Sequence, residues 1–348
     1  MMSQNETEEI RKVQLTGRST FVVSLPKKWA GGMGLKAGSS LVVSKQGIAS
    51  LVLTPRELVE PRQPKEGKIT VSEKDQLDTI ARKIIALYLV GYNLVRILAK
   101  DERITSSQRN MIKDLIRRKL VGTEVISDSA KELTMQVLFG YADLSVENAL
   151  RRMCLIAGSM IEDAIRALKE RNSGLAQEII TLDDEVDRFS FYIIRQLKSA
   201  VRNEATLRDA GFSSPTDCLG YRVIVKSVER IADHAVKMAE IAKTLQNTPN
   251  QSTIRRIDEI STYARSVFED AVKALYKKDY ALADMTVSKA EAIQTLEEKA
   301  LDAISSERDS ARISGMRMII EHIQRTAQYS SDIAEIVLNL NISKTLVL

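Results

Sequence analysis

The stretch GLAQEIITLDDEVDRF, residues 174–189, has a related copy in ALADMTVSKAEAIQTL, residues 281–296. A second pair of segments follows in the same order, VERIADHAVKMAEIA at 228–242 and IEHIQRTAQYSSDIAEIV at 320–337. Apolar residues recur every three or four positions in all four segments, which is the period of an amphipathic helix. The sequence therefore predicts one helical unit that occurs twice.

The same helical period extends from about residue 143 almost to the end of the chain. It is interrupted near RNSG (171–174), GFSSPTD (211–217), NTPNQS (247–252) and KKDY (277–280), with a weaker interruption near Ser305. These interruptions predict six helices. We expect the helices to form two three-helix bundles, over residues 141–248 and 249–348.

The first copy carries a concentration of carboxylates. Asp183 and Asp187 are four residues apart, as are Glu229 and Asp233, so each pair shares one face of its helix. If the two helices are neighbours, the four side chains converge. Like charges about 4 Å apart repel by roughly 4 kcal/mol per pair at an effective dielectric near 20, so such a cluster requires a positive counter-ion.

Two kinds of counter-ion fit this pattern. One is a metal ion with oxygen ligands, for which Mg²⁺, Mn²⁺, Fe and Zn²⁺ are all compatible. The other is ion pairing, and the arginines nearby in sequence are Arg188, Arg222 and Arg230. His234 and His322 each follow an acid by one position and point about 100° away from it, so we interpret them as surface or supporting groups rather than ligands.

These doubled segments resemble the PhoU family of phosphate-signalling proteins over about residues 143–341. The resemblance implies a repeated Glu/Asp-x-x-x-Asp motif that binds metal clusters on the bundle surface. The implied ligands of a divalent or trivalent ion (Fe, Mn, Mg or Zn) are Asp183, Asp184, Asp187, Glu229 and Asp233. In the second copy Glu291 and Glu321 remain, but Gln294 and Arg325 replace acids, so we expect no complete second cluster.

A different composition marks the N-terminal segment. Residues 10–56 contain no Asp or Glu, and β-branched runs such as STFVVSL, SSLVVS and ASLVL alternate with glycines. This pattern predicts short strands joined by tight turns. A piece of about 45 residues with few large apolar side chains buries too little surface to be stable alone, so we expect it to dimerise.

The segment 11–43, RKVQLTGRSTFVVSLPKKWAGGMGLKAGSSLVV, resembles the AbrB/SpoVT swapped-hairpin module, in which two chains interlock their strands into a DNA-binding dimer. Combined with the PhoU-like bundles, it is typical of an archaeal type of regulator. The resemblance implies a β domain over residues 1–60 and a homodimer or higher homo-oligomer. The residues implied to contact DNA are Arg11, Lys12, Arg18, Lys27 and Lys28.

A dimer would gather these cations on one face, and neutralising DNA phosphates releases counter-ions. The alternative is that the basic dimer serves only in assembly. We interpret Trp29, the single tryptophan, as a core residue rather than a base-stacking group.

Between these regions we place a middle module at residues 61–140. A proline-rich linker, TPRELVEPRQPKEG (54–67), contains three of the six prolines. A KITV strand, helices at about 73–100 and 106–121, and strand-like TEVIS and ELTMQVLF predict a small α+β fold. The fold class of the chain is therefore mixed and mainly α.

The composition, 44% hydrophobic and 28% charged residues in a chain of 348, is typical of a globular protein, and the net charge of +5 is modest. The longest apolar run, IIALYLVGY (84–92), is shorter than the roughly 18 residues of a membrane helix. The start, MMSQNETEEI, does not resemble a signal peptide, so we expect a cytoplasmic protein without membrane insertion. Cys154 and Cys218 have no Cys-x-x-Cys partner and are predicted to be buried thiols.

The sequence has no P-loop, Gly-x-Ser-x-Gly or His-Glu-x-x-His motif, so we expect no catalysis. The leading hypothesis is a DNA-binding regulator of phosphate uptake whose bundles sense phosphate status through metal or a partner. The alternative is a PhoU-type adaptor that acts on a phosphate transporter or sensor protein without binding DNA. A third reading, a metal-dependent phosphatase, would require an open coordination position.

Overall fold

The structure, a computed structural model, describes residues 9–46, 50–58, 65–138, 144–245, 250–305, 307 and 309–345. The chain divides into two compact units, Met1–Gln63 and Pro64–Leu348. The domain boundaries predicted after residues 60, 140 and 248 lie outside the described residues, as do residues 1–8.

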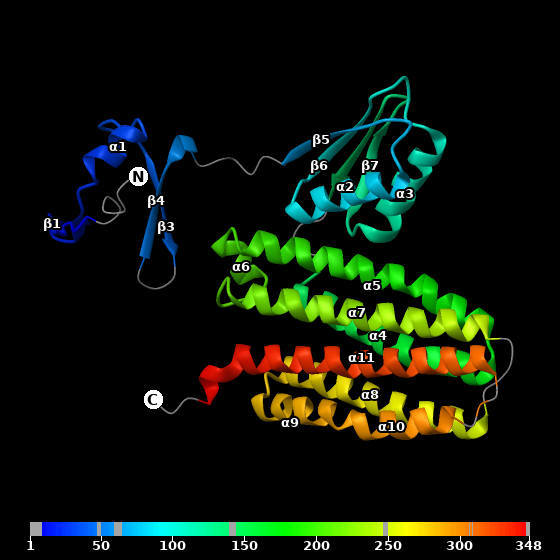
Figure 1. Ribbon diagram of the computed structural model, residues 1–348. Coiled ribbons are helices and arrows are strands. Elements are labelled where there is room, and N and C mark those ends of the chain that lie inside the picture. The colour runs from blue at the N-terminus through cyan, green and yellow to red at the C-terminus, as the bar shows by residue number, and fades with distance from the viewer. Residues whose placement is uncertain are drawn as a thin grey trace, which may run out of the picture. The chain divides into compact units, whose positions relative to one another are not determined.

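Two antiparallel hairpins and a short helix form the first unit (Figure 1). Its elements are β1 (Gln14–Thr16), β2 (Thr20–Val22), α1 (Lys27–Gly32), β3 (Leu41–Gln46), β4 (Ser50–Pro55) and η1 (Arg56–Leu58). β1 pairs with β2, and β3 pairs with β4. Gly17 begins the first hairpin turn at a φ of 68°, a backbone conformation in which other residues would be strained. The predicted short strands and tight turns are therefore present.

The first unit leaves its apolar side chains exposed. Among its described residues only Pro55 is buried, and Trp29 is half-buried. The exposed large apolar side chains are Ile10, Val13, Leu15, Phe21, Val22, Val23, Met33, Val42, Val43, Leu51 and Val52. A unit that buries so little of its own apolar surface requires other surface to cover it.

The second unit begins with a four-stranded sheet covered by two helices. The elements are β5 (Glu66–Val71), α2 (Leu77–Val90), β6 (Leu94–Ala99), α3 (Ser106–Lys119), β7 (Thr123–Asp128) and β8 (Glu132–Val137). The strand order is β5-β6-β8-β7, with β5 parallel to β6 and the other pairs antiparallel. In Figure 1, α2 and α3 lie between the sheet and the first bundle. The predicted α+β module is therefore present.

The prediction of one helix over about 73–100 was wrong in its second half. Helix α2 ends at Val90 and is followed by Gly91, whose φ of 101° belongs to the left-handed region that glycine adopts without strain. The chain then forms β6, in which Val95 and Ile97 are buried while Arg96 between them is only partly buried. This alternation has the period of a strand rather than a helix.

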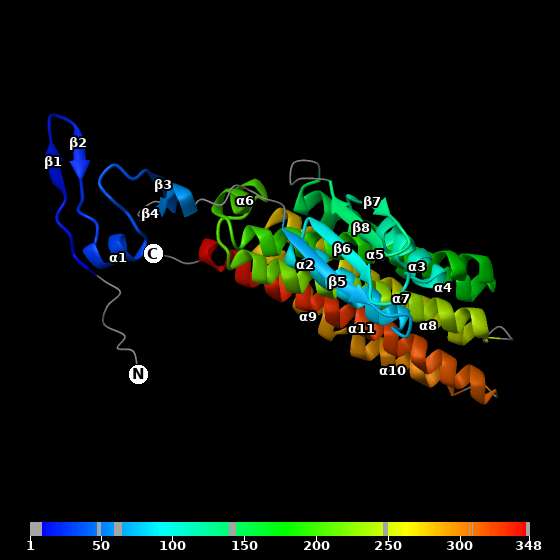
Figure 2. The same cartoon turned by 90° about the horizontal axis from the view of Figure 1, so that it is seen from above.

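Two three-helix bundles form the rest of the second unit (Figures 1 and 2). Their helices are α4 (Val146–Glu170), α5 (Ser173–Ala200), α6 (Glu204–Asp209), α7 (Asp217–Thr244), α8 (Gln251–Lys277), α9 (Tyr280–Glu291), α10 (Ile293–Ile304) and α11 (Ser310–Asn341), followed by η2 (Ile342–Lys344). Helices α4, α5 and α7 pack together, and α7 and α4 contact α11 and α8 of the second bundle. Six helices were predicted, but the fifth is divided at Ala292, and α6 is an additional short helix.

The turn between the first and second helices has the same conformation and the same kind of capping residue in both copies of the repeat. Helix α4 is followed by Arg171 and α8 by Lys278, both in the left-handed conformation with φ of 52° and 53°. The next residue then caps the following helix. Asn172 Oδ1 accepts from the backbone N–H of Leu175, and Asp279 Oδ1 accepts from that of Leu282. The two copies of the repeat therefore also have the same backbone conformation in this turn.

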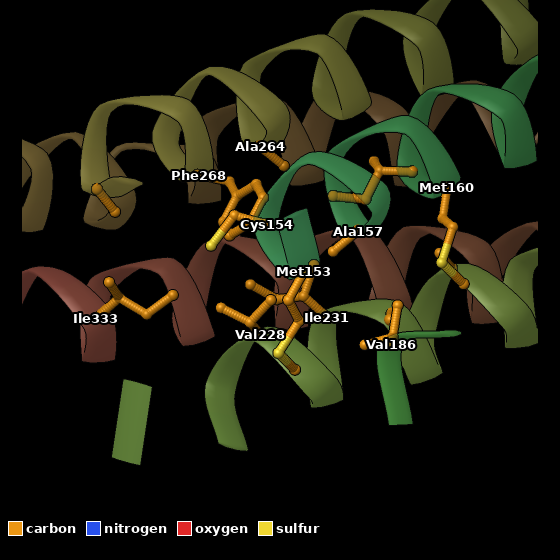
Figure 3. Packing of buried hydrophobic residues seen from close by; sticks show 14 of the residues in the cluster. Met153, Cys154, Ala157, Met160, Val186, Val228, Ile231, Ala264, Phe268 and Ile333 are labelled. Carbon is orange, nitrogen blue, oxygen red and sulfur yellow. The ribbon is translucent and has the colours of Figure 1, made fainter. Parts of the chain in front are cut away.

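One apolar cluster runs through both bundles, and a second fills the middle module beneath its sheet. Figure 3 shows part of the first cluster, where Met153 and Cys154 of α4 lie among side chains of α7 and α8. Cys154 and Cys218 are both buried, as predicted. Among the described residues, no helix combines the length and apolar character needed to cross a membrane.

Candidate functional site on the first bundle

The acidic face consists of the five predicted carboxylates on two neighbouring helices. Helix α5 carries Asp183, Asp184 and Asp187, and α7 carries Glu229 and Asp233. Helices α5 and α7 pack against each other, and Ser190 of α5 contacts Glu229 of α7 at 3.2 Å. The acids of the two helices therefore lie close enough for their charges to act on one another. The convergence expected from helical spacing is therefore present.

The positive charge beside the carboxylates of α5 comes from the middle module. Lys119, the last residue of α3, places its Nζ 3.0 Å from Asp184 Oδ1 and 2.8 Å from Asp187 Oδ2. A guanidinium nitrogen of Arg118 lies 3.6 Å from Asp184 Oδ2. Charge-assisted hydrogen bonds of this kind are stronger than neutral ones. The middle module is thus tied to the carboxylates of α5.

Glu229 has partners of its own. Lys226 Nζ lies 2.6 Å from Glu229 Oε1, one helical turn away on α7. Ser190 of α5 donates its hydroxyl to Glu229 Oε2 at 3.2 Å. The Glu229 side chain is only 13% exposed, so these contacts compensate for much of its lost hydration.

Burial and mutual repulsion raise the pKa values of three of these acids. Burial raises the pKa of Asp183 to about 7, and the charges of Asp187 and Asp233 add to the shift. Burial also raises the pKa of Asp187 and of Asp233. Burial lowers the pKa of Lys119, but the hydrogen bonds and charges of Asp187 and Asp184 outweigh it and raise that pKa to about 12. The ammonium therefore stays charged while the face still carries uncompensated negative charge.

The implied metal ion does not fit the side chains as they are arranged. Within the described ranges, no three His, Cys, Asp or Glu side chains are grouped closely enough to hold a metal ion. Asp184 and Asp187 direct oxygens at Lys119, and Glu229 directs one at Lys226. Lys119, Lys226 and Arg118 pair with these acids, in place of the arginines that are nearby in sequence. Metal binding by this face stays a prediction.

The second copy has a weaker acidic set. Burial raises the pKa of Glu297, and the charges of Glu298 and Glu321 add to that shift. Arg325, which replaces an acid of the first copy, donates to the side-chain oxygen of Gln328 at 3.1 Å.

The two histidines form a pair between the bundles. His234 Nδ1 lies 3.0 Å from His322 Nδ1, and the His234 ring stacks on Tyr329 with centroids 5.6 Å apart. Burial lowers the pKa of His234 to about 4, with the charges of His322 and Arg325 adding to the shift. Burial also lowers the pKa of His322. Among the described residues, neither ring belongs to a group of three side chains that could hold a metal ion.

The histidine pair should make the stability of the folded chain depend on pH. Both pKa values are lower in the folded chain than the usual value near 6.5, so the unfolded chain binds more protons below that pH. Above about pH 6.5 the neutral pair makes its full contribution to the free energy of unfolding. That contribution is lost as the pH falls toward 4. The charged side chains around the pair are Glu321, Arg325, Arg230, Lys237 and Glu240.

We expect the histidine pair to contribute a loss of about 1 kcal/mol between about pH 7.5 and about pH 5, reduced from the full linkage value because the rings are only half-buried. Acids of raised pKa such as Asp183 act in the opposite direction over this range, so the contribution is the difference between the wild-type chain and a variant without the pair. Urea unfolding at the two pH values measures it. A His234→Gln, His322→Gln variant should lose less than the wild-type chain. Equal losses would show that the pair does not set the dependence.

The residues predicted to contact DNA all lie in the first unit and are exposed. Arg11 and Lys12 precede β1, and Arg18 lies in the turn between β1 and β2. Lys27 and Lys28 begin α1. Arg11 also forms an ion pair with Glu9.

The two bundles match a known protein family. The PhoU domain model matches residues 150–242 and 257–337, together half of the chain. A phosphate-specific transport system accessory protein PhoU homolog from Synechocystis sp. is 23% identical over 201 residues, covering 54% of this chain and 88% of that protein. A protein of the same name from Aquifex aeolicus is 27% identical over 146 residues, covering 42% of this chain but only 64% of that protein.

A solved structure has a related fold. The crystal structure of PhoU from Pseudomonas aeruginosa matches with a TM-score of 0.51 and 20% identity, covering 57% of this chain and 96% of that one. At this identity the match concerns the fold alone. It agrees with the tandem bundles described above.

Proposed function

Because the chain belongs to the PhoU family, we propose that it is a regulatory accessory protein of phosphate transport that acts as an adaptor on a transporter or sensor component. The observation that carries this proposal is the match of the family model to both copies of the helical unit. The relatives' names describe an accessory role, which supports the alternative hypothesis over a DNA-binding regulator. Lys119 and Lys226 pair with carboxylates of the acidic face. Carboxylates that are ion-paired in this way are consistent with a protein that regulates its partner by binding it.

The experiment is capture of the phosphate transporter and the phosphate sensor protein by the full tagged chain. Detergent-solubilised membranes from cells grown in high and in low phosphate supply both candidates, and an untagged chain is the control. We expect one of the two to be retained more strongly under one phosphate condition. Retention of neither under both conditions would overturn the adaptor role.

DNA binding by the first unit is a second candidate function. It is favoured by the exposure of the five cations in a segment without acids, and by hairpins whose apolar side chains need another surface. A second copy of the chain would cover those side chains and double the positive charge. This candidate adds to the adaptor role and does not replace it.

Salt dependence tests this candidate. If about six phosphates are neutralised, the logarithm of the affinity for duplex DNA should fall with the logarithm of salt concentration at a slope near −5. A Lys27→Gln, Lys28→Gln variant should have a slope shallower by about 2, since each lost phosphate contact removes about 1. Absence of binding at low salt, in a chain shown to be folded, would leave assembly as the role of this unit.

A further inference from the structure

A groove lies between α4 and α8, the first helices of the two copies. Its volume is about 620 Å³, within the range of roughly 300–1,000 Å³ that is usual for small-molecule sites. The apolar part of its lining comes from Cys154, Leu155 and Gly158 of α4 and from Phe268 and Val272 of α8. Figure 3 shows Cys154 beside Phe268. Gly158 has no side chain to fill the space in front of Phe268, so the two helices leave an open apolar floor, which we call the α4/α8 groove.

Positive charge is in excess at one end of the α4/α8 groove. Two acids line the groove, Glu162 and Glu269, and both pair with Arg265. Lys273 and Lys277 lie two to three turns further along α8 and also line it. Neither lysine forms an ion pair with another described residue. This end therefore attracts an anionic group.

The same end offers directed hydrogen-bond donors. The guanidinium of Arg151 lies 4.0 Å from the centre of the Tyr276 ring and also pairs with the exposed Glu147 at 3.4 Å. The buried hydroxyl of Tyr276 has no oxygen or nitrogen partner among the described residues, and the Cys154 thiol beside it is a weak partner. Burial raises the pKa of Tyr276, so the hydroxyl keeps its proton and can donate it. An anionic oxygen at this end would satisfy a donor that is costly to leave unpaired.

The dimensions of the α4/α8 groove suit an extended chain. Its lining on α4 runs from Arg151 to Glu162, a length of about 16 Å at about 1.5 Å per residue. A volume of about 620 Å³ over that length gives a mean cross-section of about 40 Å². This is about half the cross-section of a helix about 10 Å across, so the groove is too narrow to enclose a partner helix.

We propose that the α4/α8 groove binds an amphiphilic carboxylate, an acyl chain that ends in one anionic group. The carboxylate accepts hydrogen bonds from Arg151 and from the Tyr276 hydroxyl, since the planar guanidinium matches the geometry of a carboxylate. The acyl chain covers Leu155, which is 69% exposed, and the floor at Phe268, and this burial favours binding. The inference goes beyond the adaptor role and concerns a site on the chain itself.

Calorimetric titration of the full-length chain with laurate tests the proposal. We expect one site per chain. Lauryl alcohol, which lacks the charge, and acetate, which lacks the chain, should each bind at least about tenfold more weakly. Gly158→Leu places a side chain in the groove and should abolish laurate binding. Equal laurate affinity in the wild-type chain and in a folded Gly158→Leu variant would overturn the proposal.

Two single substitutions test the anionic end. Tyr276→Phe removes only the hydroxyl and Arg151→Gln removes the charge, and each should weaken laurate binding about tenfold while changing the affinity for lauryl alcohol far less. The matched control for the first is Tyr263→Phe on the same helix, because the Tyr263 hydroxyl donates to the carbonyl oxygen of Lys289 outside the groove. Arg152→Gln, at the exposed next position of α4, is the control for the second. Unchanged laurate affinity in both Tyr276→Phe and Arg151→Gln would overturn the proposal.

A readout on the wild-type chain locates the ligand. The methyl resonances of Leu155 and Val272 should shift when laurate is added, and those of Leu219 on α7, which is similarly exposed, should not. Equal shifts at Leu219 would show non-specific binding and overturn the proposal, whether or not any variant folds. Shifts at Leu155 with an acidic amphipathic peptide but none with laurate would assign the groove to a protein partner instead.

Discussion

Replacing Met153 with alanine should lower the free energy of unfolding of the second unit by about 2–5 kcal/mol. The Met153 side chain is fully buried in α4. Figure 3 shows it beside Val228 and Ile231 of α7, in the core that joins the three helices of the first bundle. Truncation loses the transfer free energy of the removed atoms and leaves a cavity that the packed helices close only in part.

Leu155→Ala is the matched control for this change. Leu155 is two residues further along the same helix, is similar in size and is 69% exposed. Its truncation should change the free energy of unfolding by no more than about 0.5 kcal/mol. Urea unfolding followed by circular dichroism measures both variants. Similar losses in the two would contradict the assignment of this face of α4 to the core.

The helical period of the apolar residues predicted the bundles well, because each helix of a bundle buries one stripe of side chains. The apolar residues of α4 follow that period from Val146 to Leu168. The period fails where an apolar run is short, as in β6, since a few apolar residues fit a strand or a helix equally well. Gly91 was the usable signal, because a glycine after the last periodic residue commonly ends a helix.

The acidic face was predictable only in part, for a physical reason. Spacing along α5 and α7 is local information, so the convergence of Asp183, Asp187, Glu229 and Asp233 followed from it. The contact of Lys226 with Glu229 spans one helical turn and could have been found by the same rule. Lys119 lies 68 residues before Asp187. Its position depends on how the middle module packs on α5, which no periodicity in either segment encodes.

Replacing Arg195 with methionine should cost about 2–4 kcal/mol and uncouple the middle module from the bundle. Arg195 is 9% exposed, donates to the carbonyl oxygens of Tyr88 and Tyr92, and has its guanidinium 4.9 Å from the centre of the Tyr88 ring. Methionine fills similar volume but donates nothing, so both carbonyl oxygens lose a partner at a site with little access to water.

The uncoupling should be visible as two urea transitions in place of one, with the sheet of the middle module unfolding first. Arg202→Met is the control, because the exposed Arg202 donates to the carbonyl oxygen of Val90 at 3.3 Å, a longer bond than those of Arg195. That variant should keep the wild-type profile within about 0.5 kcal/mol. Arg195→Lys should restore only part of the loss, since an ammonium lacks the planar fork that reaches both carbonyl oxygens. A single unshifted transition in Arg195→Met would place the attachment of the module elsewhere, with Lys119 as its principal anchor.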